Sequence, residues 1–136
     1  KVNLQPFRYL KEYKIEENET YEIGQQLDVE LFEIGQTVNV SGLTIGKGNL
    51  GNIKKHGHTR GAMSHGSKSH RLQGSLGAGT TPARVLPGKK MPGRTGYEQR
   101  TIKGLEIIDI DKNQNLIVVK GSIPGKSGNL VSIKLS

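Results

Sequence analysis

The chain has 136 residues and a formal net charge of +8, which fits one modest domain that meets a polyanion. It contains no cysteine, which excludes disulfide scaffolds, thiolate zinc sites and cysteine nucleophiles. No apolar run has transmembrane length and no segment pairs a basic face with a bulky apolar one, so nucleic acid is favoured over a membrane as the partner.

The N-terminal flank, residues 1–45, predicts β-strands. Phe7, Tyr9 and Ile15, and later Val38 and Val40, stand in short, partly alternating apolar runs that glycines interrupt. These residues carry four basic and eight acidic side chains, a net charge of −4. We expect this flank to form one portion of a small β domain.

The middle segment, residues 46–100, carries the whole positive excess. It holds eleven lysines and arginines against Glu98 alone, a net charge of +10, together with 12 of the 19 glycines and all four histidines. Only six of its 55 residues are Leu, Ile, Val or Phe, too few for a core of its own. So long a stretch without a core is either disordered or ordered by a partner, and its charge selects RNA.

One short helix is expected inside this segment. Leu50 and Ile53 are three residues apart and support one or two helical turns between Gly48 and Lys55, with Gly57 as the stop.

The C-terminal flank, residues 101–136, again predicts strands and has a net charge of +2. Apolar runs at 107–110 and 116–119 enclose a polar turn, and we expect a hairpin buried on both faces. Residues 130–135 alternate and predict a last strand. The fold class is therefore mainly β, a small antiparallel barrel or sandwich with a long basic extended loop.

The glycines around Lys47 invite comparison with a nucleotide-binding loop, but the spacing fails. Three residues separate Gly42 from Gly46 where that motif needs four, and Gly48 follows Lys47 where the motif has Ser or Thr. We therefore expect no nucleotide cofactor and no small-molecule substrate, whereas backbone N–H groups remain available to RNA phosphates.

The histidines and neighbouring serines do not indicate a catalytic or metal site. No carboxylate lies between Glu33 and Glu98 to complete a metal site or to orient an imidazole beside Ser64 or Ser67. Eleven nearby cations also oppose a divalent ion. We expect no metal, no catalytic residue and no enzymatic activity, and we interpret the imidazoles as RNA contacts, with solvated loop histidines as the alternative.

Several ordered blocks make the chain similar to a known family, the third protein of the large ribosomal subunit (the universal ribosomal protein L-three family), in its bacterial and plastid form. The blocks are Val38-Asn-Val-Ser-Gly-Leu-Thr-Ile-Gly-Lys-Gly48, His65-Gly-Ser-Lys-Ser-His-Arg71, Gly74-Ser-Leu-Gly-Ala-Gly-Thr-Thr-Pro82 and Gly88-Lys-Lys-Met-Pro-Gly-Arg94.

The resemblance implies a translation-type β-barrel, incomplete in this chain because the family's N-terminal part is missing. Residues 1–45 and 101–136 would be its barrel portions, and residues 46–100 an extended rRNA-binding loop. It further implies early binding of large-subunit rRNA near the peptidyl-transferase region, neighbouring large-subunit ribosomal proteins as partners, and a ribosome of a plastid (chloroplast) rather than of the bacterial cytoplasm.

The rRNA-binding residues expected from charge and chemistry all lie in the middle segment. Aromatic residues are nearly absent there, which favours folded RNA over single strands read on aromatic platforms. A general nucleic-acid chaperone with a disordered basic arm is the alternative function, and a small β-barrel enzyme using the His and Ser cluster is the competing class. The expected contacts are Lys47, Lys54, Lys55, His56, His58, Arg60, His65, Lys68, His70, Arg71, Arg84, Lys89, Lys90, Arg94 and Arg100.

Overall fold

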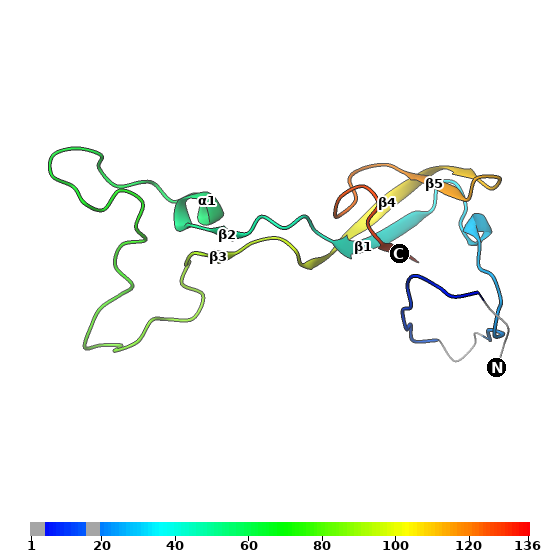
Figure 1. Ribbon diagram of the computed structural model, residues 1–136, viewed down its shortest axis with the longest axis horizontal. Helices are drawn as coiled ribbons and strands as arrows, with labels where there is room; N and C mark the ends of the chain where they lie inside the picture. The colour runs from blue at the N-terminus through cyan, green and yellow to red at the C-terminus, as the bar shows by residue number, and fades with distance from the viewer. Residues whose placement is uncertain (1–4, 16–19) are drawn as a thin grey trace. The chain divides into compact units, whose positions relative to one another are not determined.

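The computed structural model describes residues 5–15 and 20–136 and is mainly β, as the sequence predicts (Figure 1). The described residues divide into two compact units, one of residues 5–15, 20–36 and 106–120 and the other of residues 37–105 and 121–136. The described part of the chain contains no helix long and apolar enough to cross a membrane.

The elements in chain order are η1 (Val29–Leu31), β1 (Thr37–Leu43), β2 (Asn49–Leu50), α1 (Asn52–His56), β3 (Gly93–Arg94), β4 (Gln99–Asp111), β5 (Leu116–Val119) and β6 (Val131–Leu135).

The first unit is built on the hairpin that the C-terminal flank predicts. The second half of β4 pairs antiparallel with β5, from Ile107 opposite Val119 to Asp111 opposite Leu116. The segment before β1 joins the other side of β4, since the Gly35 N–H donates to the Ile107 carbonyl at 2.8 Å. Ile107 is the buried side chain at this place, with 1% of its surface exposed.

The expectation that this hairpin is buried on both faces is wrong. Ile108 and Leu116 are each 51% exposed, while Ile117 and Val119 are half-buried. The register shifts between Ile107 and Asp109, so Ile108 is the extra residue of a β-bulge. A continuous apolar run therefore still has an inner and an outer face, because side chains along a strand alternate between the two sides.

The strand interpretation of residues 5–15 is also wrong. Phe7, Tyr9 and Ile15 lie in extended or irregular backbone outside any strand, and Phe7 is 65% exposed. Alternating apolar residues favour a strand only where a second strand completes the hydrogen bonds.

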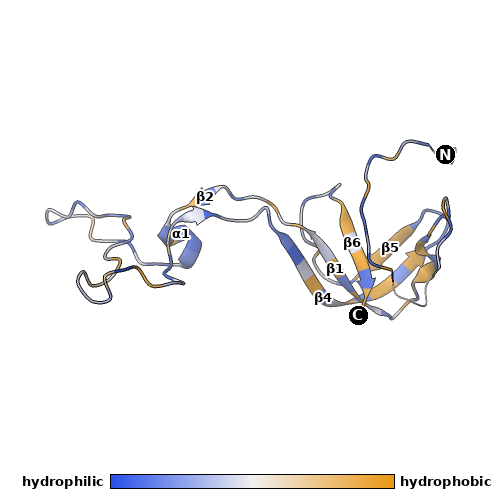
Figure 2. Cartoon of the chain, turned by 90° about the horizontal axis from the view of Figure 1, so that it is seen from below, coloured by the Kyte–Doolittle hydropathy of each residue, from blue (hydrophilic) through white to orange (hydrophobic). Residues whose placement is uncertain are grey.

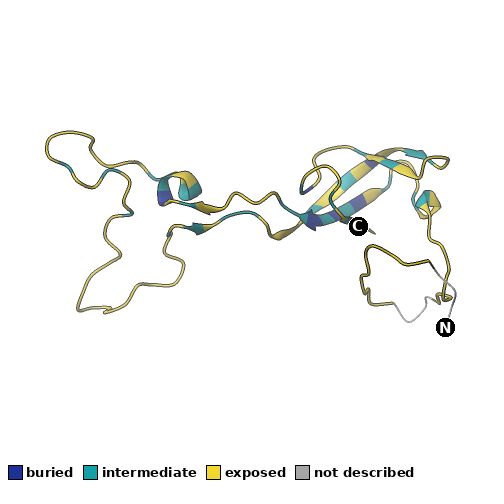
Figure 3. Cartoon of the chain, in the orientation of Figure 1, coloured by how far each residue is buried: buried dark blue, intermediate teal, exposed yellow. Residues whose placement is uncertain are grey.

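The second unit carries a three-stranded sheet portion, in which β1 lies between the first half of β4 and β6. β1 pairs antiparallel with β6, from Val38 opposite Leu135 to Gly42 opposite Val131. Val38 and Val40 are buried, as their alternation predicts (Figure 3). Gly42 is buried as well, and a Cβ there would lie 3.0 Å from the Pro124 carbonyl oxygen. Val131–Leu135 confirms the predicted last strand.

A long excursion leaves the sheet after β1 and returns into β4 (Figure 1). Residues 44–50 and 93–98 run side by side as its stem, held by N–H donation from Lys47 to the Thr95 carbonyl and from Thr95 to the Gly48 carbonyl, both at 2.9 Å. The two-residue strands β2 and β3 pair within this stem. Residues 51–92 form the distal loop. The excursion is mostly hydrophilic or neutral, whereas the strands of the sheet are rich in hydrophobic residues (Figure 2).

The helix expected after Gly48 is present as α1. Its residues are Asn52–His56, and Gly57 ends it in a left-handed conformation with φ of 69°, as predicted for the stop. Leu50, assigned to the helix from the sequence, lies in β2 instead.

Candidate nucleic-acid interface

The fifteen expected contact residues are distributed over the excursion and the start of β4. Lys47 and Arg94 lie on the stem, Arg100 on β4, and Lys54, Lys55 and His56 on α1. The other nine lie in the distal loop: His58, Arg60, His65, Lys68, His70, Arg71, Arg84, Lys89 and Lys90.

Positive charge in this region has almost no internal counter-charge. Glu98 is the one carboxylate of residues 46–100, and its Oε1 lies 2.9 Å from Nη2 of Arg100. Both side chains are more than half exposed, so this pair contributes little to stability. Among the described residues, no other cation of the segment is in a salt bridge.

α1 is fixed against the returning leg of the loop. Asn52, only 3% exposed, donates from Nδ2 to the Lys90 carbonyl at 3.2 Å, and Nε2 of His56 lies 3.0 Å from the Met91 carbonyl oxygen. A carbonyl only accepts, so Nε2 carries the proton. The three basic residues of α1 are thereby brought to the Lys89–Lys90 part of the chain.

The helix also contacts the stem and the start of the loop. A Cβ on Gly93 would lie 3.1 Å from Nζ of Lys55, which places this ammonium group against β3. The rings of His56 and His58 are 5.8 Å apart, centroid to centroid. Five of the expected contacts therefore lie near one another: Lys54, Lys55, His56, His58 and Lys90.

A smaller closed turn organises residues 61–70. The Gly61 N–H donates to the His70 carbonyl at 2.9 Å, and Nδ1 of His70 lies 2.9 Å from the Ala62 carbonyl oxygen. A Cβ on Gly61 would collide with the carbonyl of Ser69, so glycine is required for this approach. The hydrogen bond fixes the proton of neutral His70 on Nδ1 and leaves Nε2 as an acceptor.

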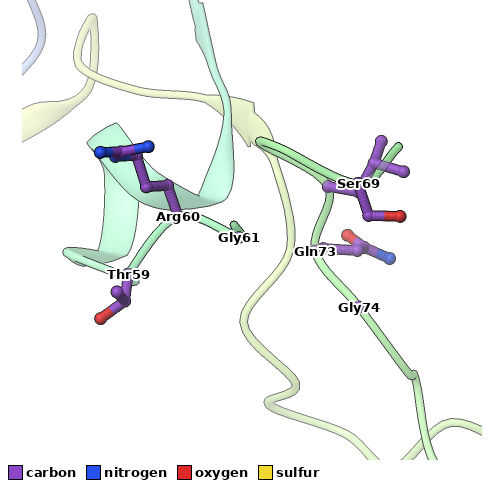
Figure 4. Close-up of a pocket in the computed structure, with 7 residues that line it drawn as sticks. Thr59, Arg60, Gly61, Ser69, Gln73 and Gly74 are labelled. Carbon is purple, nitrogen blue, oxygen red and sulfur yellow. The ribbon is translucent and has the colours of Figure 1, made fainter. Parts of the chain in front are cut away.

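A groove of about 540 Å³ lies between residues 59–61 and 69–74. Figure 4 shows that the side chains of Thr59 and Arg60 on one segment and of Ser69 and Gln73 on the other point away from one another. The groove is therefore bordered mainly by backbone and does not bring polar groups to one point. It offers close backbone approach rather than a pocket for a small molecule.

Other cations are spread along the distal loop, which is mostly exposed (Figure 3). Lys68, Arg71 and Arg84 are exposed, as is His65. No apolar side chain of residues 46–100 is buried, although all of them are described. Across residues 5–15 and 20–136, no group of three or more His, Asp or Glu side chains is arranged to hold a metal ion. Spread cations without a core or an anion suit a phosphate backbone rather than a compact ligand.

Sequence reasoning missed several residues that shape this region. Asn52 and Gly61 make the contacts that fix α1 and the 61–70 turn, and Tyr97 presents its ring to the guanidinium of Arg94, an expected contact, 5.2 Å from the ring centroid. Each contact with Asn52 or Gly61 joins residues eight or more positions apart, so no local pattern of the sequence announces it.

The comparisons with known proteins agree with the resemblance found in the sequence blocks. The family described as Ribosomal protein L3 matches residues 12–116. The chain is 55% identical over 132 residues to the large ribosomal subunit protein uL3c of Guillardia theta, covering 97% of this chain and 65% of that protein. It is 56% identical over 127 residues to uL3 of Prochlorococcus marinus strain AS9601, covering 93% of this chain and 58% of that protein.

A third relative is uL3c of Phaeodactylum tricornutum, 56% identical over 133 residues, which cover 98% of this chain and 64% of that protein. The chain thus spans less than two thirds of the length of these relatives. The matched residues include β1, the stem, the distal loop and β4. On this match and these identities, the chain belongs to the ribosomal protein L3 family.

Proposed function

We propose that the chain is a structural, non-enzymatic constituent of the large ribosomal subunit that binds large-subunit rRNA through residues 46–100. Its relatives in Guillardia theta and Prochlorococcus marinus are named as proteins of that subunit. Relatives of both plastid and cyanobacterial type are among the matches, and we propose a ribosome of one of these two kinds, with the plastid favoured.

The observation that carries the proposal is the segregation of charge onto a coreless excursion. Ten of the eleven lysines and arginines of residues 46–100 lack a carboxylate within salt-bridge distance among the described residues, and none of the apolar side chains there is buried. Like charges that cannot pair internally repel one another, and RNA phosphates supply the missing anions.

The parts have separate roles in this proposal. Residues 1–45 and 101–136 contribute the barrel portions of a translation-type domain, and the stem carries the distal loop away from the sheet into folded rRNA. The fifteen basic and histidine side chains contact phosphates, riboses and base edges. Family resemblance supports the finer statements, which are binding early in subunit assembly, stabilisation of rRNA near the peptidyl-transferase region, and contact with neighbouring ribosomal proteins.

The first test is the salt dependence of binding to a large-subunit rRNA transcript. If about six phosphates are neutralised, the slope of log K against log salt concentration is expected near −4 to −5, at roughly 0.7 to 0.9 per contact. Filter binding or fluorescence anisotropy between 50 and 300 mM salt (roughly the range over which phosphate contacts weaken) measures it. A slope near zero would refute the electrostatic account.

Single substitutions distinguish a role in RNA binding from a role in the stability of the fold. Arg71→Ala and Lys89→Ala are each expected to weaken rRNA binding and to make the salt slope less steep by about 1. Neither should lower the melting temperature, because both side chains are exposed. Lys134→Ala, an exposed cation on β6, is the matched control and should change neither quantity. Lower thermal stability in the Arg71 or Lys89 variant would mean that the side chain is structural.

Competition separates this function from a general RNA chaperone. A chaperone with a basic arm would bind an unrelated structured RNA as tightly as large-subunit rRNA. We expect the unrelated RNA to compete at least tenfold less well, because specific sites generally exceed non-specific binding by about a thousandfold or more.

A further inference from the structure

A second feature of the second unit lies at the base of the stem, outside the expected contact residues. There a cavity of about 280 Å³ lies between the end of β1, residue Tyr97 of the returning stem, and residues 126–129 of the turn before β6. Its lining includes Leu43, Thr44, Tyr97, Lys126 and Asn129.

The turn side of this cavity is fixed by hydrogen bonds. Nδ2 of Asn129 donates to the Leu43 carbonyl at 2.9 Å, and the Asn129 N–H donates to the Lys126 carbonyl at 3.1 Å. Gly125 has a φ of 106°, and a Cβ there would collide with the Asn129 side chain and the Leu43 carbonyl. The backbone that carries Lys126 is therefore held to the end of β1.

The stem side is equally well defined. The Thr44 hydroxyl donates to the Glu98 carbonyl at 3.1 Å, and the Thr44 N–H donates to the same carbonyl at 3.0 Å. Gly96 approaches the Ile45 carbonyl so closely that a Cβ would overlap with it. These contacts position the backbone on both sides of Tyr97.

Tyr97 itself is held in an unusual way. It is the only aromatic residue of positions 46–100, its φ is 55°, and 58% of its surface is exposed. A bulky residue with a left-handed φ is uncommon and persists where the surrounding structure determines it, often at binding sites. One side of the ring is occupied by the Arg94 guanidinium, 5.2 Å from the centroid.

An exposed aromatic ring backed by a guanidinium, with a lysine across a small cavity, matches the chemistry of one nucleotide. A base stacks on the aromatic face or on the planar guanidinium, and an ammonium group pairs with a phosphate. A carboxylate ligand could pair with Lys126 or with the guanidinium but would leave the aromatic ring unused.

We propose that this cavity at the stem base binds a single unstacked nucleotide of rRNA, with its base on the Arg94–Tyr97 pair and a phosphate at Lys126. The inference rests on the proposed function and extends the interface to Tyr97 and Lys126. It is compatible with recognition of folded RNA, because one extruded base is sufficient.

Affinity measurements on the full chain provide the first test, with the large-subunit rRNA transcript as the probe. Tyr97→Asn removes the ring but tolerates the left-handed backbone, and it should lower the affinity about 5- to 100-fold at every salt concentration, leaving the slope unchanged. Tyr97→Phe retains the ring and should restore most of the affinity. Lys126→Ala should instead make the salt slope less steep by about 1, while Lys134→Ala should leave the slope unchanged.

Fluorescence provides the second test and does not depend on the stability of the asparagine variant. The chain contains no tryptophan, so Tyr97→Trp introduces a single indole reporter at the site. The rRNA transcript should quench this emission, because a base stacks on the indole. Heparin, a polyanion without bases, should bind the basic loop without quenching.

The outcomes distinguish the inference from the function on which it rests. Equal quenching by heparin and rRNA, or a Tyr97→Asn affinity within twofold of the wild type, overturns the nucleotide site. If the wild-type salt slope stays near −4 to −5, at about six neutralised phosphates, the proposed function survives that result. A wild-type slope near zero would refute the proposed function itself.

Discussion

Gly61 is the residue at which the distal loop depends most directly on the absence of a side chain. Its N–H donates to the His70 carbonyl, and a Cβ there would overlap with the Ser69 carbonyl. Gly61→Ala should therefore open the 61–70 turn and break the hydrogen bond between His70 and Ala62. Amide hydrogen exchange should show loss of protection at position 61, consistent with a bond that contributes about 1 kcal/mol.

The matched control for this substitution is Gly79→Ala in the same loop. Gly79 has an ordinary φ and no atom within 4 Å of the position where a Cβ would lie. This variant should retain protection at Gly61 and bind rRNA as the wild type does. Retained protection in Gly61→Ala would show that the turn adjusts without cost.

At the residue scale, the sequence predicts charge placement well and close contacts poorly. The lysines and arginines of residues 46–100 could be assigned to the surface because a segment with six Leu, Ile, Val or Phe residues has no interior in which to bury them. The positive φ of Tyr97 and the approach of Gly96 to Ile45 were not predicted. Both features depend on contact with the segment around Ile45, about fifty positions earlier in the chain, and a local sequence pattern does not predict so distant a contact.

α1 is the element whose order depends most on docking. Five residues are too few for a helix that is stable by itself in water. Asn52 joins it to the Lys90 carbonyl from an almost fully buried position. Asn52→Ala should remove this bond, at a cost of about 1 kcal/mol or more, and leave the Lys90 carbonyl without its donor.

Exchange at two amides reports on this substitution. The Lys55 N–H donates to the Gly51 carbonyl at 2.9 Å and the Gly57 N–H to the Ile53 carbonyl at 3.0 Å, so both should exchange faster in Asn52→Ala. Asn49→Ala, at an exposed position of β2, should leave both rates unchanged. Unchanged rates in both variants would show that the helix does not depend on Asn52.

At the element scale, the predicted strands hold where periodicity and a partner coincide. β1, β5 and β6 were predicted from apolar alternation or a short apolar run, and Gly57 correctly predicted the end of α1. The two-residue strands β2 and β3 were not predicted, because two residues establish no period. Residues 5–15 have the alternation but lie outside any strand, since alternation describes only the faces of a strand and not its hydrogen-bond partner.

At the scale of the whole molecule, charge and packing divide along the same boundaries. The flanks at 1–45 and 101–136 carry net charges of −4 and +2, and the segment between them carries +10. The buried Val and Ile side chains of the described residues, Val38, Val40 and Ile107, all belong to strands of the flanks, and buried Pro124 lies in the C-terminal flank before β6. Hydrophobic burial thus stabilises the sheet, while the distal loop is held by a few hydrogen bonds and, in the proposed function, by rRNA.

This division predicts the order of tryptic cleavage within residues 46–100. Residues 74–90 are all exposed, and the stem is held by paired backbone hydrogen bonds. Cleavage requires local unfolding, and the free energy of local unfolding is lowest where backbone hydrogen bonds are fewest. In the free protein, trypsin should therefore cut after Arg84 before it cuts after Lys47 or Arg94.

Mass spectrometry of a short digestion time course measures this order, and adding large-subunit rRNA tests its cause. Bound phosphates order the loop and cover its basic side chains, so cleavage after Arg84 should slow more than cleavage after Lys112, which is exposed in the turn between β4 and β5. Equal slowing at both positions would indicate that RNA merely inhibits the protease. Cleavage of the stem before the distal loop would contradict the expected order of stability, because the stem with its paired backbone would then be the less stable part of the excursion.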